Sequence, residues 1–142
     1  PDEIVQTAPD DRLEPAKGEC ITPVPDDAPV PTFRHPEFGA PSDTWPYHSH
    51  AGDLLGYVAR YNPPGTRKQF VPWTLWRDSE GLRWRMKNWP HPRPLYGLDR
   101  LTASPAASVV VVEGEKCADA AGAVFPTSVV VTSPGGSQAA HK

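Results

Sequence analysis

The chain has 142 residues, enough for one ordinary domain or two small ones, and a formal net charge of −3. Only 38% of its residues are hydrophobic and 19 are prolines, so part of the chain is not expected to fold around a core. Two cysteines exclude a disulfide framework. No apolar run could span a bilayer and no signal peptide is present, so we expect a cytoplasmic protein without a membrane partner. Because the first residue is proline, we expect a piece of a longer protein.

Residues 1–44 are predicted to form an acidic, proline-rich linker that is largely extended or disordered. They include ten acidic and three basic residues, and prolines recur along the whole segment. Proline has no backbone donor, and the segment offers few aromatic side chains to bury. A short piece around Phe33 to Phe38 could become ordered on contact with the domain that follows.

Residues 45–92 are predicted to form a small, basic, antiparallel sheet. Residues 60–100, which overlap it, hold nine basic and three acidic residues, a balance that favours a polyanionic partner. Alternating side chains, separated by turn residues, predict four strands at 45–50, 55–61, 69–76 and 82–87. Pro72 indicates an edge or a bulge in the third strand.

The last of these strands carries a basic face. Arg83, Arg85 and Lys87 project to one side of it, and Arg93 follows in the next connection. These four residues are the predicted contacts with nucleic acid; an exposed, solvated sheet face is the alternative. Four tryptophans in the region favour a domain core, with stacking on bases as the alternative: Trp73, Trp76, Trp84 and Trp89.

Residues 108–142 predict a strand, a helix and a second strand. Val109 to Val112 is typical of a strand covered on both faces, as in a parallel sheet, and Ser128 to Thr132 is a similar run. A crossover of this kind joins parallel strands. Apolar residues at helical spacing lie between the runs, and Cys117 among them is expected to be a small core residue. The fold class is therefore α+β/α/β, with the antiparallel sheet preceding a parallel β-α-β unit.

Polar residues and glycines follow both valine runs. Glu113 ends the first run, and a Ser-Pro-Gly-Gly turn follows the second. Ligands bind beyond the carboxyl ends of the strands in open α/β sheets, so Glu113 and this turn should face one cleft. Gly114 is expected to permit a tight strand-to-helix turn. Glu115 and Lys116 are expected in a solvated first helical turn, with a catalytic role as the alternative. A phosphate or nucleotide loop is predicted, with a plain turn as the alternative, from Gly114, Ser133, Gly135 and Gly136.

These residues resemble the first half of a Toprim domain, the fold shared by DNA primases, topoisomerases and some nucleases. The Val-Glu-Gly ending at Gly114 and the Leu-Tyr-Gly-Leu segment at 95–98 are similar to those of primases. The Glu-Gly-Glu-Lys variant with a Pro-Gly-Gly turn is most similar to primase-like proteins of phages and mobile elements. The resemblance covers residues 93–137 well and 45–92 loosely. It implies that 93–142 is the N-terminal half of a Toprim domain with a Rossmann-like parallel sheet.

The resemblance implies a nucleotidyltransferase of DNA replication. Such an enzyme makes RNA primers on single-stranded DNA from nucleoside triphosphates, with Mg²⁺ or Mn²⁺, and a replicative helicase is a fused or separate partner. Glu113 would be the catalytic acid and one metal ligand; the alternative is a carboxylate that only precedes a helix start, where the helix dipole favours it. The Asp-x-Asp pair of that family does not occur in this sequence, so we expect it beyond Lys142 and expect this fragment alone to be inactive. No zinc site is expected, because no zinc-ribbon cysteine set is present.

Two other functions fit the same residues. One is a Toprim nuclease or a topoisomerase-like protein that cleaves DNA strands, and the second is a non-catalytic DNA-binding module. A topoisomerase would need a tyrosine nucleophile elsewhere in the natural protein. Retention of function after loss of the Glu113 carboxylate would indicate the binding module.

Overall fold

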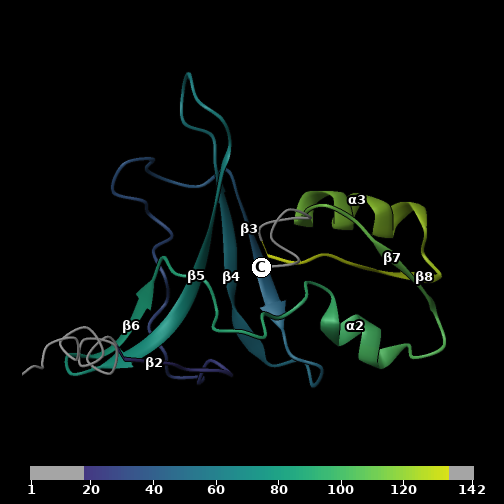
Figure 1. Ribbon diagram of the computed structural model, residues 1–142, viewed down its shortest axis with the longest axis horizontal. Coiled ribbons are helices and arrows are strands. Elements are labelled where there is room, and N and C mark those ends of the chain that lie inside the picture. The colour runs from purple at the N-terminus through teal and green to yellow at the C-terminus, as the bar shows by residue number, and fades with distance from the viewer. Residues whose placement is uncertain (1–17, 135–142) are drawn as a thin grey trace, which may run out of the picture.

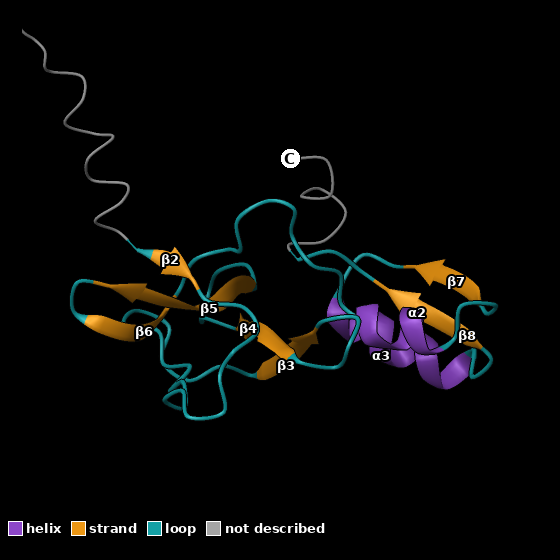
Figure 2. Cartoon of the chain, turned by 90° about the horizontal axis from the view of Figure 1, so that it is seen from below, coloured by secondary structure: helices purple, strands orange, loops and turns teal. Residues whose placement is uncertain are grey.

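The computed structural model describes residues 18–134. These residues form an antiparallel sheet and a smaller α/β unit that lie side by side (Figure 1). Figures 1 and 2 both show strand β3 (Asp43–His48) as the strand of the sheet next to the helices. Residues 1–17 and 135–142, which include Gly135 and Gly136 of the predicted phosphate loop, lie outside the described part.

The predicted antiparallel sheet is observed, but it has five strands and not four, because residues 19–20 of the predicted linker add a short strand to it. The strands are β2 (Glu19–Cys20), β3, β4 (Leu54–Tyr61), β5 (Gln69–Asp78) and β6 (Gly81–Arg85). The order is β2-β5-β4-β3, and β6 pairs with β5. Pro72 lies opposite Val58 in the half of β5 that β6 does not reach, so the proline occupies a position with one paired neighbour. Strand β6 ends at Arg85, two residues earlier than predicted.

Aromatic side chains fill one core of the sheet. Trp73 and Tyr61 are buried, and the Trp73 indole N–H donates to the Tyr61 hydroxyl at 3.0 Å. That hydroxyl donates to the backbone carbonyl of Phe33 at 2.6 Å, and the Phe33 ring lies 4.8 Å from the ring of Tyr57. The Phe33–Phe38 piece therefore packs on the sheet. Trp76 and Trp89 are also buried, while Trp84 is partly exposed.

The α/β unit contains a parallel pair of strands, as predicted. Its elements are α2 (Leu98–Ala103), β7 (Ser108–Val111), α3 (Glu115–Val124) and β8 (Ser128–Val131). Strands β7 and β8 pair in parallel, with Val111 opposite Val131. Both helices contact β8. The observed architecture is thus a mixed α/β one, with a parallel β-α-β unit beside an antiparallel sheet.

The expectation that the first valine strand is covered on both faces is wrong. Val109 is 48% exposed and Val111 is 75% exposed, whereas the valines of β8 are buried. Strand β8 is the inner strand, because β7 flanks one edge and a backbone bridge between Tyr96 and Thr132 flanks the other. Among the strands of residues 18–134, β7 pairs with β8 alone, so the edge of β7 that faces away from β8 has no paired strand.

The predicted core role of Cys117 is also wrong. Its side chain is exposed, and so are the last apolar residues of α3, with Val124 at 68%. The buried residues of α3 are instead Glu115 and Ala118. The face of α3 that lies against the antiparallel sheet carries Glu115 and Asp119, which accept hydrogen bonds from Tyr47 and Trp45. The spacing of the apolar residues does not predict which face this is. None of the helices within 18–134 has the length and apolarity needed to cross a membrane.

The Leu-Tyr-Gly-Leu segment joins the two parts along strand β8. The backbone N–H of Tyr96 donates to the carbonyl of Thr132 at 2.8 Å. Gly97 adopts φ +94°, and a Cβ atom at this position would lie 2.6 Å from the carbonyl oxygen of Val130. Only glycine permits this backbone conformation together with so close an approach to β8.

Replacement of Gly97 by alanine is expected to destabilise the protein by about 2–4 kcal/mol, through both the left-handed backbone and the clash. Gly65→Ala is the matched control, because Gly65 has φ +74° but open space around a Cβ. That control should lose only about 1 kcal/mol. Urea unfolding followed by tryptophan fluorescence measures both losses, and equal losses would contradict the proposed contact with β8.

Candidate active site at the ends of the parallel strands

Glu113 lies just past the carboxyl end of β7, as predicted. The backbone N–H of Val112 donates to the carbonyl of Val131 at 3.0 Å, and the Thr132 hydroxyl donates to the Val112 carbonyl at 2.8 Å. Pairing thus continues one residue beyond each strand, and Glu113 and Ser133 are the next residues at the same edge. The Glu113 side chain is exposed and makes no hydrogen bond or ion pair with any residue of 18–134. Its carboxylate is therefore available to a ligand.

Gly114 is the residue before helix α3, but its backbone does not require glycine. Its φ of −163° is extended, and no atom lies within 4 Å of the position a Cβ would take. The expected tight turn that depends on glycine is therefore not observed. The absence of a side chain leaves free space at the start of α3, where the first backbone N–H groups of the helix lack a side-chain cap.

The predicted phosphate loop is described only in part. Ser133 is partly buried and Pro134 is fully buried, which fixes the path of the chain after β8. Gly135 and Gly136 lie outside the described residues, so their distance from Glu113 stays a prediction. Within the described part, Glu113 and Gly114 follow the carboxyl end of β7 and Ser133 follows that of β8, so all three lie past the same edge of the parallel pair.

Glu115 is buried, which corrects its expected place in a solvated helical turn. Its side chain accepts a hydrogen bond from the Tyr47 hydroxyl of β3, with 2.5 Å between Tyr47 Oη and Glu115 Oε2. Burial raises the pKa of the Glu115 carboxyl, and this hydrogen bond partly offsets the rise. Burial also raises the pKa of the Tyr47 phenol, reinforced by the nearby Glu115 charge. The pair is thus a buried polar contact between the sheet and the α/β unit.

Asp119, one helical turn after Glu115, is exposed, but it also accepts hydrogen bonds from aromatic side chains. Its two carboxylate oxygens accept hydrogen bonds from the Tyr96 hydroxyl at 2.8 Å and from the Trp45 indole N–H at 3.1 Å. The i, i+4 spacing places Glu115 and Asp119 on one face of α3. Sequence reasoning missed this role, although two acids at helical spacing beside an aromatic-rich sheet were a usable signal.

The residues at the strand ends supply only part of the ligands that a magnesium or manganese ion needs. Glu115 and Asp119 are engaged with aromatic donors, and within 18–134 no three His, Cys, Asp or Glu side chains cluster as metal ligands. Glu113 supplies one free carboxylate. Mg²⁺ is often bound by one or two carboxylates, with waters and substrate phosphates as its other ligands. Glu113 fits such a site as one ligand, but the described residues do not complete it.

Two of the predicted nucleic-acid contacts are occupied within the sheet. Arg83 and Arg85 both pair with the Asp78 carboxylate, at 2.5 Å and 3.1 Å from Oδ2. Hydrogen bonds from Arg83 and from the Glu80 backbone N–H hold the pKa of Asp78 below its usual range. The two arginines are thus partly neutralised by one carboxylate whose side chain is 3% exposed.

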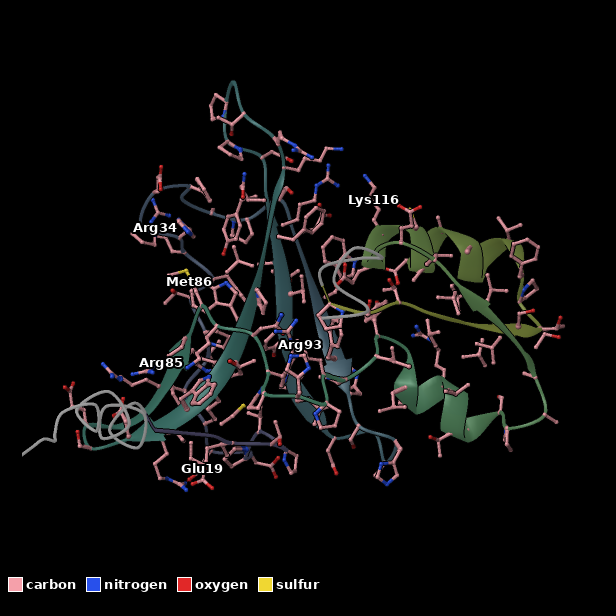
Figure 3. The ribbon with its side chains drawn as sticks, in the orientation of Figure 1. Glu19, Arg34, Arg85, Met86, Arg93 and Lys116 are labelled. Carbon is pink, nitrogen blue, oxygen red and sulfur yellow. The ribbon has the colours of Figure 1, made fainter. Side chains whose placement is uncertain are left out.

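Lys87 and Arg93, the other two predicted contacts, line a common hollow. The Lys87 ammonium lies 4.4 Å from the centroid of the Trp76 ring. Arg93 lies near the middle of the molecule, whereas Arg34 and Arg85 lie toward the side of the sheet away from the helices (Figure 3). The structure therefore divides the predicted basic row into a neutralised pair and a second pair beside a cavity.

No protein-family model, curated protein or solved structure matches this chain. The Toprim resemblance therefore stays a prediction drawn from the motifs alone. The geometry of the strand ends is the basis on which a function can be proposed.

Replacement of Tyr47 by phenylalanine is expected to destabilise the protein by about 1–3 kcal/mol, because it leaves the buried Glu115 carboxylate without its donor. Tyr57→Phe is the control, since the Tyr57 hydroxyl has no hydrogen-bond partner within 18–134 and its loss should change stability by less than about 0.5 kcal/mol. Chemical denaturation measures both variants. Equal stability of the two would show that the Tyr47–Glu115 contact contributes nothing.

Glu115 should also make stability depend on pH. Because its pKa is raised in the folded state, the folded protein binds the proton more tightly than the unfolded chain does. The free energy of unfolding should therefore fall as pH rises from the ordinary carboxyl pKa through the raised one. Glu115→Gln should remove this fall, whereas Glu37→Gln, at an exposed position, should keep it. Urea denaturation from about pH 4 to about pH 8 tests the difference, and parallel profiles for wild type and Glu115→Gln would refute it.

Proposed function

We propose that this chain is part of the catalytic core of a cytoplasmic primase-like nucleotidyltransferase that acts on single-stranded DNA with nucleoside triphosphates. In this proposal Glu113 is the catalytic acid and contributes one ligand to a divalent metal ion. Gly114 and the turn that begins at Ser133 adjoin the phosphates of the substrate. Arg93 and Lys87 lie on the side of the nucleic acid.

The observation that carries the proposal is the register of the parallel pair. Val111 lies opposite Val131, and pairing continues to Val112 and Thr132, so Glu113 and Ser133 each follow a strand that ends at the same edge. This is the edge at which open α/β sheets bind their ligands. An exposed, unpaired carboxylate there can act as a general base or bind a metal.

The surroundings of Glu113 favour a phosphate-bearing substrate. Gly114 leaves open space beside the uncapped N-terminus of α3, where backbone N–H groups favour negative charge. A bound Mg²⁺ would offset charge on the transferring phosphoryl group. Glu113 would hold the ion or accept the proton of the attacking hydroxyl, and the Glu115–Tyr47 contact would fix the first turn of α3 beside it.

Glu113→Gln in the natural protein should lower primer synthesis by at least about 100-fold while leaving binding of single-stranded DNA unchanged. The variant keeps the size of the side chain but removes the charge that a base or a metal ligand needs. Glu37→Gln, an exposed acid of the N-terminal part, is the control and should keep full activity. Labelled nucleotide incorporation on a single-stranded template, with Mg²⁺ present, measures activity.

Two results would redirect the proposal. Metal-dependent strand cleavage by the wild type, lost in Glu113→Gln without any primer synthesis, would indicate the nuclease or topoisomerase-like alternative. Full function of Glu113→Gln would indicate a DNA-binding module without catalysis.

A further inference from the structure

We propose that two adjoining hollows around the Trp89–Leu95 connection bind a nucleotide, with its phosphate on Arg93. The site is separate from the strand ends, because neither hollow is lined by Glu113, Gly114 or Ser133. Binding at Arg93 does not depend on the chemistry proposed for Glu113. The nucleotide can be free or can be one unit of a single strand, since both present the same base and phosphate.

The hollows have room for such a ligand. Their volumes are about 530 Å³ and 460 Å³, and they share the four lining residues Trp89, Pro90, His91 and Arg93. The larger one is completed mainly by apolar side chains, among them Leu55 and Leu95. Ligand sites are typically concave and mostly apolar, with a few polar groups that fix orientation.

The charged groups of these hollows are all basic or histidine. Lys87, His91 and Arg93 line them, and no aspartate or glutamate of residues 18–134 does. Arg93 makes no ion pair or hydrogen bond with any residue of 18–134, and its Nε atom is buried without a partner. A buried guanidinium donor is costly to leave unsatisfied, and its planar fork suits phosphate oxygens. Arg83 and Arg85, which share Asp78, show how this protein neutralises arginines elsewhere.

Two tryptophans that line the hollows, Trp89 and Trp76, are fixed by hydrogen bonds without a ligand. The Trp89 indole N–H donates to the Leu55 carbonyl at 3.0 Å, and the Trp76 indole N–H donates to the Thr74 hydroxyl at 2.6 Å. That hydroxyl in turn donates to the backbone carbonyl of Lys87 at 2.7 Å. The walls and the backbone that carries Lys87 are thus fixed by hydrogen bonds, which reduces the ordering that binding would require.

The rigid apolar wall beside an unpaired guanidinium selects a ligand with a flat or apolar body and one anionic group. A nucleotide satisfies both conditions. Inorganic phosphate satisfies only the second, and a nucleoside satisfies only the first. These three ligands therefore separate the two contributions.

The test titrates the full 142-residue chain by calorimetry with AMP, adenosine, inorganic phosphate and a ten-residue oligothymidylate, in EDTA so that no metal site contributes. AMP should bind about tenfold more tightly than adenosine, because only AMP reaches Arg93 with a charge. Arg93→Gln should reduce AMP binding to the level of adenosine and leave adenosine binding unchanged. Arg34→Gln, which removes the same charge at an exposed position away from the hollows, should change neither.

Binding of the oligonucleotide alone, lost in Arg93→Gln, would support the site and assign it to a nucleotide within a strand. Three results would overturn the proposal. AMP and adenosine could both bind with the same affinity, the two arginine variants could lose the same affinity for AMP, or neither AMP nor the oligonucleotide could bind. If Arg93→Gln does not fold, the wild-type chain still decides. In NMR spectra of the wild type, the Trp89 indole N–H resonance must shift on titration with AMP. If only the oligonucleotide binds, the same resonance must shift with that ligand. Shifts confined to other tryptophans would overturn the site.

Discussion

The structure depends on two carboxylates of helix α3 that accept hydrogen bonds from aromatic side chains of other elements. Glu115 accepts from Tyr47, and Asp119 accepts from Trp45 and Tyr96. These bonds join the α/β unit to strand β3 and to the connection before α2. Glu115 is buried, and a buried carboxylate is costly unless it is hydrogen-bonded, so its contact with Tyr47 disfavours other rotations of α3 about its axis. The exposed Asp119 adds two partly buried hydrogen bonds on the same face. Since Glu113 lies just before the first turn of that helix, the same contacts determine where the strand-end carboxylate lies.

Much of this fold follows from short-range pattern. Alternation and turn residues predicted the antiparallel strands, because each requires only neighbours along the chain. The valine runs flanking a short helix predicted a parallel pair, since parallel strands are joined by a crossover that usually contains a helix. The position of Glu113 at the end of β7 follows directly from that pairing. These features are local or topological, and a single sequence carries enough information to specify them.

The features that were not predicted depend on partners distant in sequence. The helical spacing of Cys117 and its apolar neighbours predicts a core position for it. In the structure, hydrogen bonds from Tyr47 and Tyr96 stabilise an orientation of α3 in which Glu115 is buried and Cys117 is exposed. Val111 was expected to be covered, yet β8, not β7, is the inner strand, because Tyr96 pairs with its other edge. No periodicity within a segment encodes which of two similar strands a remote residue will pair with.

Glu113 and Glu115, two residues apart, have opposite environments, and this contrast bears on function. A carboxylate that stabilises the fold is buried and satisfied, as Glu115 is by Tyr47. A carboxylate that binds a metal or takes a proton must keep its lone pairs free and accessible. The Glu113 carboxylate meets this condition, since it is exposed and has no partner among residues 18–134. Exposed surface acids are common and need no function, so exposure alone is a weak argument. Its weight comes from position: the exposed acid is the one at the carboxyl end of a parallel strand, with open space beside Gly114 where a phosphate could enter.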